Sequence, residues 1–109
     1  MEIGSGIQRS TGVIAQRDIK LSGYHNIVEA LDAQDSEIDP ETPIMVLSFR
    51  GELYELNTLG AIIWEYLELP RSLEEVLNEV SEQFEVNRST VESDVVEYLD
   101  QLSQLGLVG

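Results

Sequence analysis

The chain has 109 residues, with 21 acidic against 6 basic side chains and a formal net charge of −15. Its hydrophobic fraction of 42% is ordinary for a globular protein and too high for an acidic disordered tail. The absence of cysteine excludes a disulfide framework, a zinc–thiolate site and an iron–sulfur cluster. Because there is one histidine, most histidine-based metal sites and catalytic triads are also excluded. We therefore expect no catalytic residues, no metal site and no cofactor.

The charge and the hydropathy also constrain partners and location. No apolar run approaches the ~20 residues of a membrane helix, and the N-terminus lacks a signal-peptide pattern, so we expect a cytoplasmic protein that does not bind membranes. Residues 1–23 hold three basic and two acidic residues, a net of +1, whereas residues 24–109 hold three basic and nineteen acidic residues, a net of −16. A surface of this sign repels nucleic acid and attracts cationic partners.

The N-terminal part of the chain carries weak structural signals. Residues 1–12 are rich in glycine and serine and have no periodicity. We predict a flexible N-terminal segment over residues 1–23 and a single domain over residues 24–109. A first strand is expected within residues 24–32, and residues 34–43 form an acidic loop with two prolines.

A β-hairpin is predicted from residue 44 onward. Residues 44–49 are a short apolar run, residues 50–51 are Arg-Gly, and residues 52–57 alternate in polarity. A two-residue turn at Arg-Gly pairs the two runs antiparallel, with a core face that contains Met45, Leu47, Phe49, Tyr54 and Leu56.

Three helices follow, over residues 58–68, 73–84 and 90–105. The predicted N-caps are Asn57, Ser72 and Ser89. The two serines are each followed three residues later by a glutamate, Glu75 and Glu92, which completes a capping box. Pro70 ends the first helix and Gly106 the third. Trp64 lies off the apolar stripe of its helix and is expected to close the core. The alternative is contact with a partner. The sequence thus predicts an α+β, winged-helix-like domain in which a three-stranded antiparallel sheet precedes three helices.

The sequence from residue 56 onward resembles the PqqD-like family, whose members are also called RiPP recognition elements. Residues 56–64, LNTLGAIIW, are similar to the family's opening of the first helix, and residues 105–108, LGLV, to its ending. The segments RSLEEVLNEVSEQFEV and STVESDVVEYLDQLSQLGLV fill the interval between them. The resemblance covers residues 44–109. It implies a small non-catalytic protein that binds the leader of a ribosomally made precursor peptide.

The resemblance also implies where the leader binds. In the family, the leader adds as a strand beside the third strand, against the last helix. Here that strand supplies Glu52, Leu53, Tyr54, Glu55 and Leu56. The expected contacts on the helix over residues 90–105 are Glu92, Val96, Leu99 and Ser103. For Val96 and Leu99 the alternative is a wider core face of the same helix.

The resemblance implies a partner enzyme, either a radical-SAM enzyme or a leader peptidase. The alternative is a winged-helix-like adaptor that binds no peptide. DNA binding is disfavoured because the presumed recognition helix, residues 88–100, offers Arg88 against four carboxylates.

Overall fold

A computed structural model describes residues 6–17, 29 and 41–109 of the chain. The chain forms two compact units. One unit is Gly12–Glu65, and the other joins Met1–Thr11 to Tyr66–Gly109.

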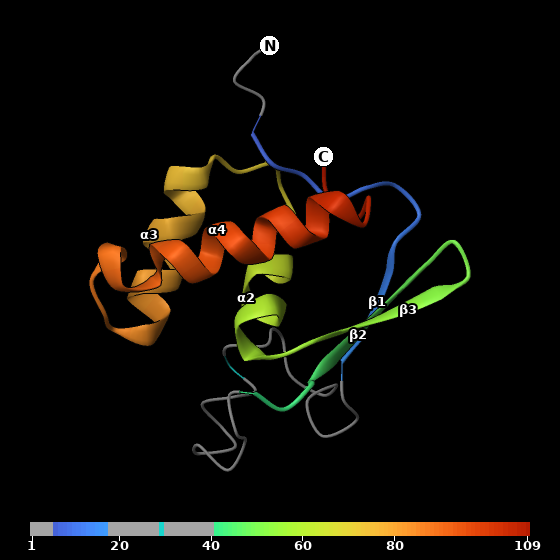
Figure 1. Cartoon of the computed structure of the whole chain (residues 1–109), viewed down its shortest axis with the longest axis horizontal. Coiled ribbons are helices and arrows are strands. Elements are labelled where there is room, and N and C mark those ends of the chain that lie inside the picture. The colour runs from blue at the N-terminus through green and yellow to red at the C-terminus, as the bar shows by residue number, and fades with distance from the viewer. Residues whose placement is uncertain (1–5, 18–28, 30–40) are drawn as a thin grey trace. The chain divides into compact units, whose positions relative to one another are not determined.

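The unit Gly12–Glu65 contains a three-stranded antiparallel sheet. Its strands are β1 (Ile14–Arg17), β2 (Met45–Phe49) and β3 (Glu52–Leu56), in the order β1-β2-β3 (Figure 1). The expected three-stranded sheet is therefore confirmed, with a first strand N-terminal to the range in which we expected it. The strand expected within residues 24–32 lies outside the described residues, apart from Glu29, which is helical. The division of the chain at residue 23 stays a prediction.

The β2–β3 hairpin has the predicted register, with Leu47 opposite Tyr54. Its turn residues, Arg50 and Gly51, both have positive φ angles, 53° and 81°, which is the signature of a type I′ turn. The predicted core face is buried at Met45, Leu47, Phe49 and Leu56, and Tyr54 is half-buried.

Helix α2 (Thr58–Tyr66) follows the hairpin directly. The backbone N–H of Gly60 donates to Asn57 Oδ1 over 3.0 Å, which confirms Asn57 as the N-cap. Trp64 is 2% exposed, so it belongs to the core as predicted. Within the same unit, Arg17 at the end of β1 donates to Glu65 of α2 through Nε at 3.0 Å and through Nη2 at 2.9 Å. Both side chains are about one-fifth exposed, and the pair joins the sheet to α2.

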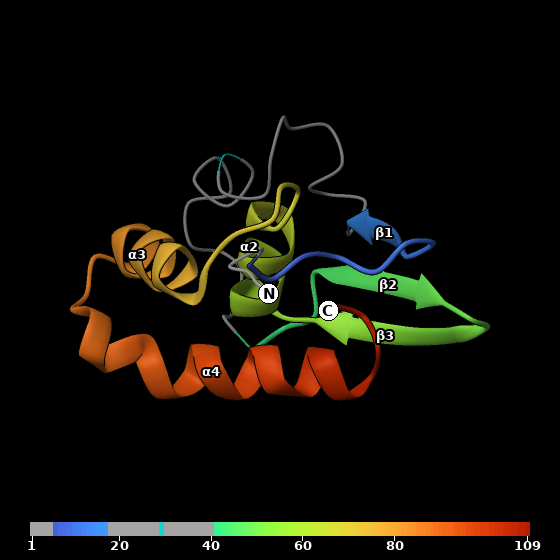
Figure 2. The same cartoon turned by 90° about the horizontal axis from the view of Figure 1, so that it is seen from above.

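The other unit contains α3 (Leu73–Phe84) and α4 (Arg88–Gln104), which pack against each other (Figure 2). The capping box of Ser72 and Glu75 is present with both reciprocal hydrogen bonds. The second predicted capping box is wrong: α4 begins at Arg88 after Asn87, so Ser89 lies inside the first turn. Asparagine is as favourable as serine at an N-cap, and the extended backbone of Asn87 takes that role without a side-chain hydrogen bond.

The end of α4 is fixed by a Schellman motif. Gly106 has a φ of 78°, the N–H of Gly106 donates to Ser103 O at 3.0 Å, and the N–H of Leu107 donates to Leu102 O at 2.9 Å. Leu107 is fully buried, so the chain folds back onto the core after the helix. Backbone bonds of 3.3 and 2.9 Å between Gln8 and Gly109 then join the two ends of the chain.

The N-terminal segment of this unit also pairs with Arg71, two residues before α3 begins. Ile7 and Arg71 exchange backbone hydrogen bonds of 2.6 and 2.9 Å. The preceding residue, Gly6, has a φ of +81°, and a Cβ added there would lie 2.7 Å from Arg71 O. Glycine is therefore required at this close approach of two backbones.

The end of α3 yields a stability prediction. Glu85 adopts a left-handed conformation with a φ of 56°, in a position where glycine has no steric penalty. We expect Glu85→Gly to raise the free energy of unfolding by about 0.5–1 kcal/mol, measured by urea denaturation. The control is Glu82→Gly, three residues earlier and inside α3, which should lower it by about 1 kcal/mol. A Glu85→Gly variant no more stable than the parent would contradict this account.

Candidate functional site

One edge of the sheet is open at β3. This strand pairs with β2 on one side, and no other strand in the described part of the chain pairs with its second side. The two-residue turn makes Phe49 and Glu52 a hydrogen-bonded pair. Bonded and non-bonded pairs alternate along an antiparallel ladder, so Tyr54 also bonds to β2. Leu53 and Glu55 therefore direct their backbone N–H and C=O groups to the open edge.

The side chains of β3 divide between the two faces of the strand. Leu53 and Glu55 share one face, on which Leu53 is 72% exposed. Glu52 is exposed and Leu56 is 2% exposed on the face that carries the core of the hairpin. The open edge therefore combines free backbone groups, one exposed apolar side chain and two exposed carboxylates.

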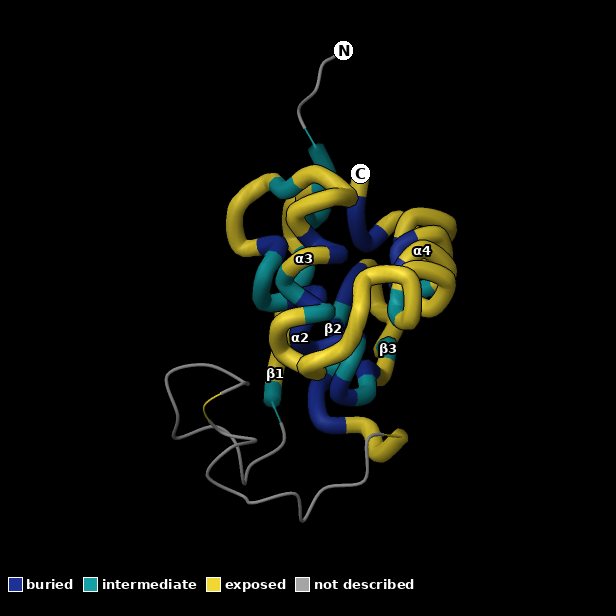
Figure 3. The backbone as a smooth tube through the Cα atoms, turned by 90° about the vertical axis from the view of Figure 1, so that its left-hand side faces the viewer, coloured by how far each residue is buried: buried dark blue, intermediate teal, exposed yellow. Residues whose placement is uncertain are grey.

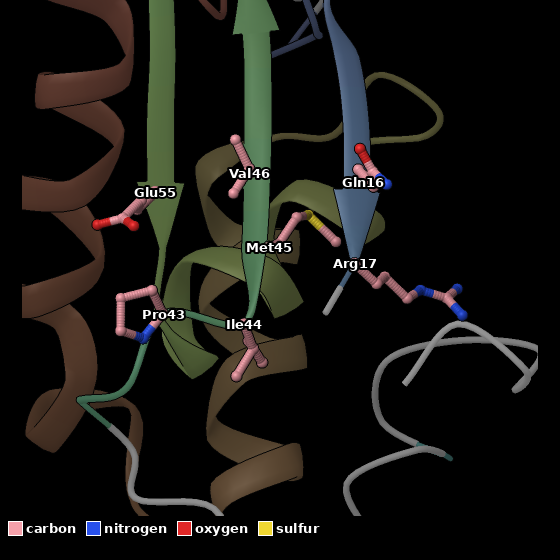
Figure 4. Close-up of a pocket in the computed structure, with 7 residues that line it drawn as sticks. All are labelled: Gln16, Arg17, Pro43, Ile44, Met45, Val46 and Glu55. Carbon is pink, nitrogen blue, oxygen red and sulfur yellow. The ribbon is translucent and has the colours of Figure 1, made fainter. Parts of the chain in front are cut away.

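A pocket of about 230 Å³ lies in the unit Gly12–Glu65, where β1 ends and β2 begins (Figure 4). Its surface is about equally polar and apolar, and the apolar part comes from β2 and the residues before it. The lining residues are Gln16, Arg17, Pro43, Ile44, Met45, Val46 and Glu55. In Figure 4 the side chain of Glu55 projects from β3 away from β2, whereas Arg17 projects to the opposite side. Three of the lining residues, Gln16, Val46 and Glu55, lie opposite one another in the sheet and so share one face.

The predicted contact residues on α4 differ in exposure. Glu92 and Ser103 are exposed, and Val96 is 42% exposed, so all three are available to a partner. Leu99 is 7% exposed, as the alternative of a wider core face requires. Figure 3 shows that most positions of α4 are exposed. Contact of any of these four residues with a peptide stays a prediction.

Sequence reasoning did not find the part of the surface that β1 contributes. Ile14 is 68% exposed and pairs with Ser48, whose other neighbour is Leu53. The three residues form a row across one face of the sheet. Because the side chains of Ile14–Arg17 are mostly exposed, this strand has no apolar alternation by which it could have been predicted.

Two classes of feature are absent from the described residues. They contain no group of three histidine or acidic side chains arranged to hold a metal ion. None of the helices among them is both long enough and apolar enough to cross a membrane.

Comparison with known proteins identifies relatives of this chain. The family model described as coenzyme PQQ synthesis protein D (PqqD) matches residues 37–108. The structure of TbiB1 in complex with the TbiA(beta) leader peptide is similar with a TM-score of 0.61 and 24% identity, over 93% of each chain. No curated protein sequence matches.

A second solved structure is similar at lower identity. It is the PqqD truncation of Methylobacterium extorquens PqqCD, described as a functional and stand-alone RiPP recognition element. Its TM-score is 0.63 at 11% identity, over 94% of this chain and 87% of that one. At these identities the two structures establish a shared fold, with the sheet followed by three helices that the sequence predicted.

The two apolar positions on α4 yield a paired stability prediction. Val96→Gln exposes no core and should change the free energy of unfolding by less than about 0.5 kcal/mol. Leu99→Gln places an amide at a buried position and should lower it by about 3 kcal/mol. Urea denaturation followed by circular dichroism measures both. Equal losses in the two variants would show that Val96 belongs to the core.

Proposed function

The chain belongs to the PqqD family, and we propose that it binds the leader of a ribosomally synthesised precursor peptide by β-strand addition. In this proposal the protein is not an enzyme. It holds the leader and presents it to a modifying enzyme of the radical-SAM class or to a leader peptidase, in the cytoplasm.

The open edge of β3 is the observation that carries the proposal. Strand addition needs a row of unpaired backbone donors and acceptors at a sheet edge, and Leu53 and Glu55 supply them. The five residues of β3 are enough for a short peptide strand, and the 72% exposed side chain of Leu53 gives the peptide apolar surface to cover. Leu56, the last residue of β3, is buried, so its side chain anchors β3 to the core and does not contact the peptide.

The exposed face of α4 enters the proposal separately. Val96 is an apolar side chain on a helix whose exposed positions are mostly acidic or polar, with Glu92 four residues before it. An exposed apolar side chain within a polar surround can supply the apolar part of a peptide contact. We assign Glu92, Val96 and Ser103 to leader binding, and Leu99 to the support of that surface.

A bound leader peptide is present in the structure of TbiB1, which shares the fold of this chain. The similarity supports leader binding as the function of the shared fold. Which class of enzyme receives the leader is part of the proposal, and a precursor gene beside the gene for this chain would name it.

The first binding prediction concerns the backbone donor of Leu53. Leu53→Pro removes the N–H that faces the open edge and leaves the hydrogen bonds to β2 in place. We expect it to weaken binding of a fluorescently labelled synthetic leader, taken from a precursor encoded nearby, by roughly tenfold or more. Leu53→Ala keeps the donor and should cost less. Fluorescence anisotropy measures both, with a scrambled leader as the reference peptide.

The matched control lies on the opposite edge of the sheet. By the same alternation, Ala15 of β1 directs its N–H away from β2, so Ala15→Pro removes an edge donor from the other side. Binding should be unchanged in this variant, and circular dichroism must show that each variant folds. A folded Leu53→Pro variant that binds the leader like the parent would overturn strand addition at β3. Failure of the parent protein to bind any leader would favour the adaptor function.

The second binding prediction concerns α4. Val96→Gln should weaken leader binding by about threefold to tenfold while the stability is kept, because it replaces exposed apolar surface with an amide. Val86→Gln is the control, since Val86 is 39% exposed and lies outside α4. Equal affinities of the parent and Val96→Gln proteins would remove α4 from the leader site.

A further inference from the structure

We infer that the peptide strand which adds to β3 carries two cationic side chains three residues apart, one opposite Glu52 and one opposite Glu55. The inference rests on the proposed function and specifies the class of peptide that this edge accepts. Two apolar residues occupy the positions between the cations.

Two free carboxylates on β3 are the starting observation. Glu52 and Glu55 are exposed, and no cationic partner contacts either of them among the residues that the structure describes. Arg50, the neighbour in the turn, lies over the ring of Phe49 at 4.8 Å. Arg17, which lines the pocket beside Glu55, is paired with Glu65. The cations near β3 therefore have other partners.

The spacing of these carboxylates sets the spacing in the peptide. Residues directly opposite each other on neighbouring strands lie on the same face, with Cβ atoms about 4.5–5.5 Å apart, so opposite charges there attract. Because Glu52 and Glu55 are three positions apart, their partners in the added strand are also three positions apart. This holds for a parallel and for an antiparallel peptide.

The residues between the carboxylates favour apolar partners. Leu53 is 72% exposed and Tyr54 is half-buried, and each gains from an apolar side chain across the strand. The pocket beside Glu55 adds apolar lining from Pro43 and Val46. A lysine or arginine opposite Glu55 would lay its methylene stem along such a surface and direct its charge to the carboxylate.

Charge also selects against other occupants of the edge. A second copy of this chain brings a net charge of −15, and an acidic peptide meets the same two carboxylates. Both are disfavoured by like-charge repulsion, which strengthens as the low-dielectric edge is covered. The occupant that fits is a short extended peptide with the pattern cation, apolar, apolar, cation.

The test is a selection from a random twelve-residue peptide display library on the immobilised full-length chain. The parent protein should enrich peptides with lysine or arginine at two positions three residues apart. A synthetic peptide from the enriched set should bind Glu52→Gln/Glu55→Gln roughly tenfold more weakly, about threefold for each pair. The charge-reversed Glu52→Lys/Glu55→Lys protein should instead enrich peptides with acidic residues at this spacing.

The matched control is Glu82→Gln/Glu85→Gln. These two exposed carboxylates are also three residues apart, but they lie at the end of α3, and their replacement changes the net charge by the same amount. Affinity for the enriched peptide should change less than twofold. An equal loss in both double variants would overturn the inference, because it would reduce the effect to net charge.

The remaining outcomes separate this inference from the proposed function. Enriched peptides without paired cations, which still require the donor of Leu53, would overturn the charge pattern and leave strand addition standing. Enriched peptides that bind Leu53→Pro as well as the parent protein would overturn strand addition at β3. A parent protein that enriches no peptide would overturn both.

Discussion

The turn of the β2–β3 hairpin is the constraint on which the candidate site depends. Arg50 and Gly51 both have positive φ angles, and this conformation closes a two-residue loop whose twist matches that of the strands. The loop length fixes the register, and a slip of one residue would move every side chain of β3 to the other face. The same register decides that Leu53 and Glu55 direct backbone groups outward. One turn therefore sets both the core face of the hairpin and the chemistry of its free edge.

The acidic side chains at the open edge of β3 differ in their surroundings from those elsewhere on the surface. Across most of the described surface, acidic side chains on α3 and α4 are solvated and contribute little to stability individually. On β3 the carboxylates flank free backbone groups, where an incoming strand must approach them closely. In the proposed complex the sign of this charge would select the peptide, since strand addition through backbone atoms alone would accept any extended peptide. In the proposed complex, backbone groups would supply affinity, and Glu52 and Glu55 would supply discrimination.

The sequence predicted those elements whose signals are local. The hairpin register followed from the Arg-Gly turn and the alternation around it, and α3 followed from Ser72 and Glu75 in a capping box. The predicted start of α4 was wrong because Asn87 and Ser89 are both good N-caps, and local preference does not choose between them. The position of β1 was missed because Ile14–Arg17 is a short, mostly exposed strand. Its place is set by pairing with β2, which is tertiary information.

The exposed side chain of Leu53 connects solubility with recognition. An apolar residue on an open edge strand invites pairing between copies, and soluble proteins protect such edges with charged residues. In β3 the apolar residue stands between two carboxylates, so the edge remains usable while self-association is opposed by charge. A protein selected only for solubility gains nothing from keeping Leu53 exposed and its backbone N–H free. The combination is expected when an edge must stay available to one class of peptide, and under the proposed function the carboxylates that protect the edge would also define that class.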